Sequence, residues 1–136
     1  MPISFPHESK GFHQFAELIG LDFTKLDKGY SQCILDVNEK LMNPHKVLHG
    51  GVMYSMADTG MGGALYSLLN EGELCATVEI KISYFKPVRS GKLVCDTHVI
   101  HKGKRIGILE SEIKNDDTLV AKANGTFSIF KPKGTV

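Results

Sequence analysis

Residues 50–70, GGVMYSMADTGMGGALYSLLN, form the one long helical pattern in the sequence, and they decide the fold. Apolar and small residues recur there at the three- and four-residue spacing of an α-helix. They cover a broad arc made of Val52, Met53, Met56, Ala57, Gly60, Met61, Ala64, Leu65 and Leu68. An arc this wide predicts a helix that is buried on most sides.

Four segments after this helix are predicted to be β-strands, because they alternate apolar and polar residues and are rich in β-branched types. They are residues 74–86, 92–101, 104–114 and 118–130, and short turn-like sequences separate them. Consecutive strands with short connections predict an antiparallel meander.

The segments before the helix are shorter. Residues 8–20 predict a small amphipathic helix, and residues 21–38 predict two strands or one hairpin. Residues 39–48 are expected to form a loop, because Pro44 disfavours helical geometry at Asn43. One central helix beside a long antiparallel sheet predicts an α+β fold in which the sheet wraps the helix.

The composition fits a single folded domain over residues 1–136, with 42% hydrophobic and 23% charged residues. A formal net charge of +1 argues against electrostatic capture of nucleic acid. No apolar run approaches the roughly 18 to 20 residues that span a bilayer, so no membrane partner is expected. Three scattered cysteines and an N-terminus without a secretory pattern predict a cytoplasmic protein.

Asp58 is an acidic residue within the apolar pattern of this helix. At 100° per residue it lies in the same stripe as Tyr54, Met61 and Leu65. A carboxylate among apolar side chains costs several kcal/mol if it is unpaired. Two interpretations carry similar weight: an Asp that faces solvent or caps a neighbouring turn, and a catalytic base.

The residues His49-Gly50-Gly51 open the helix. The N–H groups of a first helical turn lack partners and lie at the positive end of the helix dipole, and glycines let a ligand approach them closely. Such donors suit a carbonyl oxygen that becomes negative during acyl transfer. Glycines also serve tight turns, so the indication comes from their combination with Asp58 two turns further on.

Other motifs fail. His45 and His49 have the spacing of a zinc motif but lack its Glu, so no metal site is expected. Gly60, Gly62 and Gly63 follow a helix rather than a strand, which excludes a dinucleotide fingerprint. We interpret these glycines as letting the sheet press against the helix, and we expect no metal or redox cofactor.

The spacing of these residues resembles a known family. Asn43 is followed six residues later by His49-Gly50-Gly51, then by Asp58, and then by the strand ATVEIKISYFKP at 76–87. Over residues 42–130 this pattern resembles the phenylacetyl-CoA thioesterase type of the hotdog superfamily. The resemblance implies a hotdog fold, an antiparallel β-sheet wrapped around a long central α-helix, and hydrolysis of an acyl-CoA thioester.

The resemblance also implies roles. Asp58 acts as base or nucleophile, and the N–H of Gly50 polarises the thioester carbonyl. Asn43 and His49 lie alongside, and Thr77 helps to place the attacking water. The family forms homodimers whose sites combine residues of both subunits, and these dimers commonly pair as tetramers.

A dimer would need an edge strand. Strict alternation along residues 74–84 puts Thr77, Glu79, Lys81 and Ser83 on one face and Ala76, Val78, Ile80 and Ile82 on the other. If this strand pairs with its twin across a two-fold axis, Thr77 of one chain could approach Gly50 of the other.

The basic cluster His101-Lys102-Gly103-Lys104-Arg105, with Lys86 and Arg89, is expected at strand ends. It is either a solvated hairpin tip or a site for the phosphates of coenzyme A, and the fold resemblance favours the second. The candidates for substrate and CoA binding are Gly51, Tyr54, Met61, Lys86, Arg89, Lys102, Lys104 and Arg105.

The function expected from the sequence is hydrolysis of an aryl- or medium-chain acyl-CoA to the free acid and CoA. CoA is then part of the substrate and not a cofactor. The alternative is a non-catalytic acyl-CoA-binding or scaffold protein on the same fold. Whether Asp58 activates water or attacks directly to give a mixed anhydride stays open.

Overall fold

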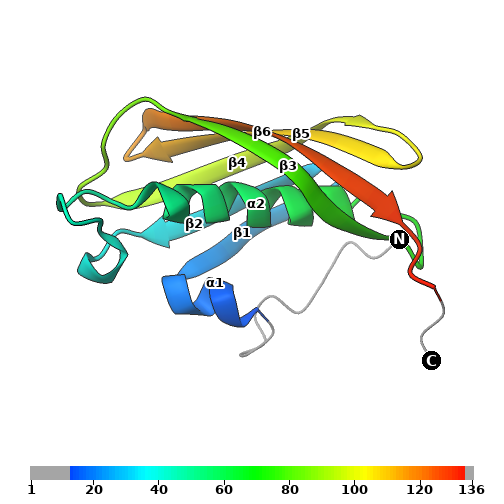
Figure 1. The fold of residues 1–136 in the computed structure, drawn as a ribbon, viewed down its shortest axis with the longest axis horizontal. Coiled ribbons are helices and arrows are strands. Elements are labelled where there is room, and N and C mark those ends of the chain that lie inside the picture. The colour runs from blue at the N-terminus through cyan, green and yellow to red at the C-terminus, as the bar shows by residue number, and fades with distance from the viewer. Residues whose placement is uncertain (1–12, 134–136) are drawn as a thin grey trace.

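A computed structural model describes residues 13–133 of the chain. One antiparallel sheet of six strands curves around a central helix (Figure 1). In chain order the elements are α1 (Gln14–Ile19), β1 (Leu21–Asp27), β2 (Tyr30–Asp36), the 3-10 turn η1 (Glu39–Leu41), α2 (Gly50–Tyr66), β3 (Leu74–Tyr84), β4 (Lys92–Lys102), β5 (Ile106–Asn115) and β6 (Thr118–Phe130). The predicted α+β hotdog fold is confirmed.

The strand order is β1-β2-β4-β5-β6-β3, which corrects one expectation. Strands β4, β5 and β6 form the predicted meander, but β3 pairs with β6 at the edge of the sheet and not with β4. Residues 85–91 carry the chain back across one end of the sheet. The N–H of Phe85 bonds to Val120 of β6, and the carbonyl of Gly91 accepts from Val37 beyond β2. This crossing places β4 beside β2 and leaves β3 at the edge.

Helix α2 is buried on most sides, as its apolar arc predicts. Met56, Ala57, Met61, Ala64 and Leu65 have no accessible surface, because they pack against the concave face of the sheet. The helix ends at Tyr66, earlier than the predicted residue 70, and Ser67 follows as its C-cap.

The predicted N-terminal helix is shorter in the structure. Helix α1 begins at Gln14 and ends before Gly20, whose φ of +81° suits a glycine C-cap. Residues 8–12 of the predicted segment lie outside the described residues. The loop predicted at 39–48 contains η1 and a bridge between Met42 and Leu48.

A β-bulge in β3 changes which residues face the helix. The pairing of β3 with β6 shifts register between Thr77 and Glu79, so Val78 is the extra residue. Thr77 therefore points towards α2, on the same face as Ile80 and Ile82, whereas strict alternation would put it on the opposite face. Its hydroxyl bonds to Asp58 of α2.

Residues 13–133 contain neither a membrane-spanning helix nor a cluster of metal ligands. None of their helices has the length and apolar character needed to cross a bilayer. Within the same residues, no three His, Cys, Asp or Glu side chains are grouped so that they could hold a metal ion.

Candidate active site

The N-terminus of α2 presents an open hydrogen-bond donor. His49 is the N-cap, and its Nδ1 accepts a 2.8 Å hydrogen bond from the N–H of Gly51. Within residues 13–133, the N–H of Gly50 has no hydrogen-bond partner. A Cβ atom on Gly50 would lie 3.0 Å from the ring of Tyr84, so only glycine fits without displacing that ring. The Gly50 N–H, at the positive end of the helix dipole, can therefore stabilise an oxyanion.

Asn43 shapes the loop that leads into this helix. Its Oδ1 accepts a 2.8 Å hydrogen bond from the N–H of His45, and its N–H donates to the carbonyl of Val47. The Nδ2 group of Asn43 has no partner in the part of the chain that the structure describes. Its two donors are thus available on the loop that ends at His49.

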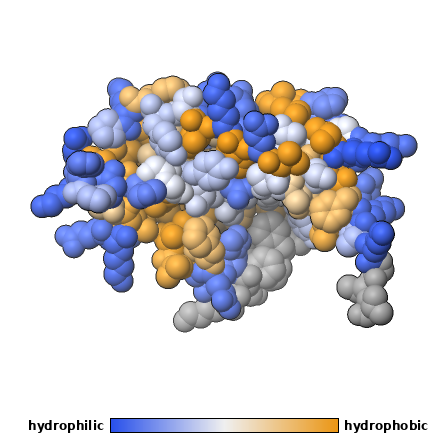
Figure 2. Space-filling model, viewed as in Figure 1, coloured by the Kyte–Doolittle hydropathy of each residue, from blue (hydrophilic) through white to orange (hydrophobic). Residues whose placement is uncertain are grey.

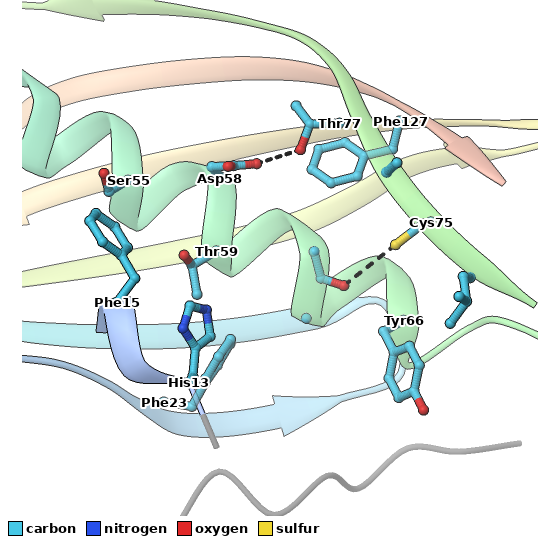
Figure 3. A pocket seen from close by; sticks show the side chains of 14 residues that line it. His13, Phe15, Phe23, Ser55, Asp58, Thr59, Tyr66, Cys75, Thr77 and Phe127 are labelled. Atoms are coloured by element: carbon cyan, nitrogen blue, oxygen red, sulfur yellow. Dashed lines mark hydrogen bonds between the residues drawn. The ribbon is translucent and has the colours of Figure 1, made fainter. Parts of the chain in front are cut away.

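Asp58 lies two turns further along α2 and is partly buried. Its Oδ1 accepts a 2.6 Å hydrogen bond from the hydroxyl of Thr77 (Figure 3). No residue between 13 and 133 bonds to its other carboxylate oxygen. The carboxylate is therefore oriented by one oxygen, and the second is free to accept a proton or to attack a carbonyl carbon.

A cleft of about 530 Å³ opens beside Asp58, a size typical of small-molecule sites. Helix α2 forms its floor, α1 and β1 one wall, and the beginning of β3 the other (Figure 3). The lining is mostly aromatic and small: His13, Phe15, Phe23, Ser55, Asp58, Thr59, Gly62, Gly63, Tyr66, Leu74, Cys75, Ala76, Thr77 and Phe127.

The thiol in this cleft is not a strong nucleophile at neutral pH. Burial, and secondarily the negative charge of Asp58, raise the pKa of Cys75 to about 11 from an ordinary 9.0. Its Sγ donates a weak 3.9 Å hydrogen bond to the carbonyl of Gly62. Because the reactive form is the thiolate, Cys75 contributes a neutral wall to the cleft.

Two predicted substrate-binding residues do not line the cleft. Met61 is fully buried in the core and packs against Gly125 of β6, on the sheet side of α2. Tyr54 is 37% exposed and is not among the residues that line the cleft. Asp58 lies at one edge of the stripe that it shares with them, and the helix residues that line the cleft, Ser55, Thr59, Gly62 and Tyr66, continue round α2 on the far side of Asp58. Gly51 is adjacent to the open donor, but its own N–H is used by His49.

The predicted basic residues form two separate groups. Lys102, Lys104 and Arg105 lie at the β4–β5 hairpin, near the C-terminal end of α2, where Leu65 packs under Gly107. Lys86 and Arg89 flank Val88, whose carbonyl accepts from the N–H of Leu48 just before α2 begins. A single chain therefore does not bring all five cations together. Their role in binding stays a prediction.

Sequence reasoning missed the aromatic walls of the cleft. Phe15, Phe23, Tyr66 and Phe127 come from four different elements. Phe15 belongs to residues 8–20, the segment predicted to form the N-terminal helix. Only the packing of α1 and β1 beside α2 brings it near Phe23, so local periodicity alone gave no signal for the cavity.

Comparisons with known proteins agree with this geometry. The model of the thioesterase superfamily matches residues 45–122. The acyl-coenzyme A thioesterase PaaI of Escherichia coli is 29% identical over 74% of this chain and 70% of its own length. Its solved structure has a TM-score of 0.81, with 27% identity over 91% of this chain and 88% of that one.

For two further relatives, the match covers nearly the whole length of the relative. A conserved protein of Pseudomonas aeruginosa is 35% identical, with a TM-score of 0.84 over 88% of this chain and 95% of that chain. The 1,4-dihydroxy-2-naphthoyl-CoA hydrolase of Listeria monocytogenes is 25% identical over 86% of this chain and 96% of its own.

Proposed function

The chain belongs to the thioesterase superfamily and is a thioester hydrolase, and from this premise we propose that it cleaves an aryl- or medium-chain acyl-coenzyme A. The observation that carries the proposal is the Thr77–Asp58 hydrogen bond at the edge of an aromatic cleft. It orients a carboxylate towards a cavity of suitable size and apolar character for an acyl group. The name of the E. coli relative supports an acyl-CoA substrate, and that of the Listeria relative supports an aryl acyl group.

In the proposed reaction, Asp58 removes a proton from water as the water oxygen bonds to the thioester carbonyl carbon. The carbonyl oxygen becomes negative and accepts a hydrogen bond from the N–H of Gly50. Collapse of this intermediate breaks the carbon–sulfur bond, and the CoA thiolate takes up the proton. In a second route the free oxygen of Asp58 attacks the carbonyl carbon, the carbon–sulfur bond breaks, and CoA thiolate leaves, which gives a mixed anhydride. Water then hydrolyses the anhydride to the free acid and the Asp58 carboxylate, and the proton that the water loses goes to the thiolate. Asn43 and His49 lie beside the donor in either route.

One chain cannot supply both groups to the same carbonyl. Gly50 and Asp58 are eight residues apart, which corresponds to roughly 12 Å along the helix axis at 1.5 Å per residue. Catalytic groups must lie within about 3 Å of the reacting atoms. We therefore propose that the site is composite, with Asp58 and Thr77 from one copy of the chain and Gly50 and Asn43 from a second.

Strand β3 supports such a homodimer. It is an edge strand of eleven residues with few buried side chains, and Leu74, Val78 and Tyr84 expose apolar surface along it. Figure 2 shows apolar surface interrupting the charged surface on the face in view. A long apolar edge with unpaired backbone groups is a ready partner for another strand. Pairing of β3 with its twin is the proposed interface.

The test is turnover of a panel of acyl-CoAs, followed by detection of the free thiol. Asp58→Asn keeps the shape of the side chain but removes the base, so kcat should fall by about 100-fold or more. Asp96→Asn is the matched control, because Asp96 also accepts from a hydroxyl, that of Tyr30, but on the outer face of the sheet. Binding without turnover by the unmodified protein would favour the acyl-CoA-binding alternative. Full turnover by Asp58→Asn would remove Asp58 from the mechanism.

A further inference from the structure

Helix α2 carries three glycines in four residues, and two of them have a packing reason. A Cβ on Gly60 would lie 2.9 Å from the hydroxyl of Thr97 in β4. A Cβ on Gly63 would lie 2.7 Å from the ring of Phe23 in β1. Both glycines are buried. They let the sheet approach the helix closely, as predicted from the sequence.

At Gly62, no close packing explains the glycine. A Cβ built on it meets no atom within 4 Å among the described residues. A glycine inside a helix costs about 1 kcal/mol relative to alanine, because it loses more backbone freedom on folding. Its φ is not in the left-handed region, so the backbone does not require glycine either. The unused space at Gly62 therefore needs another explanation.

The open space next to Gly62 is part of the cleft beside Asp58. Gly62 lies one turn after Asp58 and one turn before Tyr66, and all three line the floor of the cavity. Its carbonyl accepts from Cys75 on the opposite wall. Because Gly62 lies between Asp58 and Tyr66 on the same face of α2 and a Cβ there meets open space, a side chain at position 62 would project into the cleft.

We propose that Gly62 is a specificity-determining residue, whose missing side chain leaves room for a ring-bearing acyl group beyond Asp58. This inference rests on the proposed acyl-CoA hydrolysis. The cleft that Gly62 helps to line is also lined by the rings of Phe23, Tyr66 and Phe127. Aromatic rings pack well against one another in edge-to-face and offset arrangements, and a neutral thiol completes the apolar wall.

The test compares two substrates that differ by one phenyl group, acetyl-CoA and phenylacetyl-CoA. Gly62→Leu should raise KM for phenylacetyl-CoA by about tenfold or more and change the kinetics with acetyl-CoA by less than about twofold. Gly62→Ala should have a smaller effect in the same direction. Equal losses on both substrates, or no loss on either, would contradict the proposal.

A stability measurement separates this inference from the proposed function. Gly62→Ala should raise Tm, because alanine favours the helix and meets nothing, while Gly63→Ala should lower it by displacing Phe23. If the unmodified protein hydrolyses neither thioester, calorimetric binding of phenylacetyl-CoA to it and to Gly62→Leu still tests the cleft. Equal affinity, or no binding to either, would overturn the inference. So would a change of mass on light scattering for Gly62→Leu, because Gly62 would then face a subunit interface.

Discussion

The hydroxyl of Tyr84, on the edge strand β3, donates a 2.7 Å hydrogen bond to the carbonyl of Gly50 at the start of α2. Its ring also lies over Gly50 and occupies the space of a Cβ atom. Burial, and secondarily the charge of Tyr54, raise the pKa of Tyr84 above its ordinary 10.0, so the hydroxyl remains a donor at neutral pH. One strand thus contacts both halves of the proposed machinery: Thr77 orients Asp58, and Tyr84 orients the peptide beside the open N–H.

Removing the Tyr84 hydroxyl should loosen that donor. We expect Tyr84→Phe to lower kcat by about three- to tenfold with little change in KM, because the oxyanion interaction is made only in the transition state. Steady-state kinetics on an aryl acyl-CoA measures both constants. Tyr30→Phe is the matched control, since it removes a hydroxyl bonded to Asp96 on the outer face of the sheet. A change in KM alone would mean that Tyr84 contacts the substrate and does not position Gly50.

The predictable part of this site is local. Asn43, Gly50 and Asp58 lie within one loop and one helix, so helical periodicity and turn chemistry single out Gly50 and Asp58 as candidates, while the family resemblance adds Asn43 and implies their roles. The orientation of Thr77 was not predictable, because a bulge at Val78 shifts the alternation of β3 by one residue. Strict period-two counting assigns Thr77 to the wrong face.

The pairing of β3 with β6 was not predictable from the sequence for a different reason, although residues 74–84 were expected to form an edge strand. Short connections favour neighbouring strands, and residues 85–91 are short enough to suggest a hairpin. Their hydrogen bonds instead tie them to β6, to the loop before α2 and to the chain beyond β2. The aromatic cleft depends on this long-range arrangement, which is why Phe23 and Phe127 were not identified.

The basic residues of the β4–β5 hairpin should bind the phosphates of coenzyme A. Neutralising Lys102, Lys104 and Arg105 to Gln should raise KM for acyl-CoA and leave kcat nearly unchanged, as expected for uniform binding. The effect should shrink at high salt, because exposed charges are screened. Kinetics at two ionic strengths measures this.

The matched comparison for that experiment is Lys86→Gln with Arg89→Gln. This pair lies towards the opposite end of α2, so its effect shows which of the two basic groups meets the phosphates. An unchanged KM for the hairpin variant would identify the cluster as a solvated turn.

Stability should fall at alkaline pH because of two thiols in the core. Cys33 and Cys95 are direct neighbours across β2 and β4 and have no accessible surface. Burial is the largest cause that raises both pKa values above the ordinary 9.0, that of Cys95 to about 12. The two thiols contribute fully to the stability of the fold below pH 9. This contribution is lost as pH rises towards their folded-state pKa values, because in that range only the thiols of the unfolded chain ionise.

The free energy of unfolding should fall with pH at a slope that reaches about 1.4 kcal/mol per pH unit for each thiol. Urea unfolding with a reductant present, at pH 7.5, 9 and 10, measures the free energy of unfolding. The double variant Cys33→Ala with Cys95→Ala should be less stable at pH 7.5, because it leaves a cavity, but should lose less stability between pH 9 and 10. Parallel losses in the two proteins would show that other groups cause the alkaline decline.

The last prediction concerns the shared site. Asn43 lies on the loop that leads into Gly50, whereas Thr77 bonds to Asp58 within the same chain. In a dimer with composite sites, an Asp58→Asn chain and an Asn43→Ala chain would form one doubly damaged site and one intact site. Heterodimers co-expressed with different affinity tags should therefore recover about half of the unmodified activity, although each homodimer is nearly inactive.

Pairing Asp58→Asn with Thr77→Val provides the control. Because Asp58 and Thr77 belong to the same half-site, neither site of this heterodimer is intact, and activity should stay low. Recovery in the first pair but not in the second would assign Asn43 and Asp58 to different subunits of one site. Light scattering at the assay concentration must show a dimer or a larger oligomer. A monomer that turns over substrate would contradict the shared site, because the roughly 12 Å between Gly50 and Asp58 would then have to be closed within one chain.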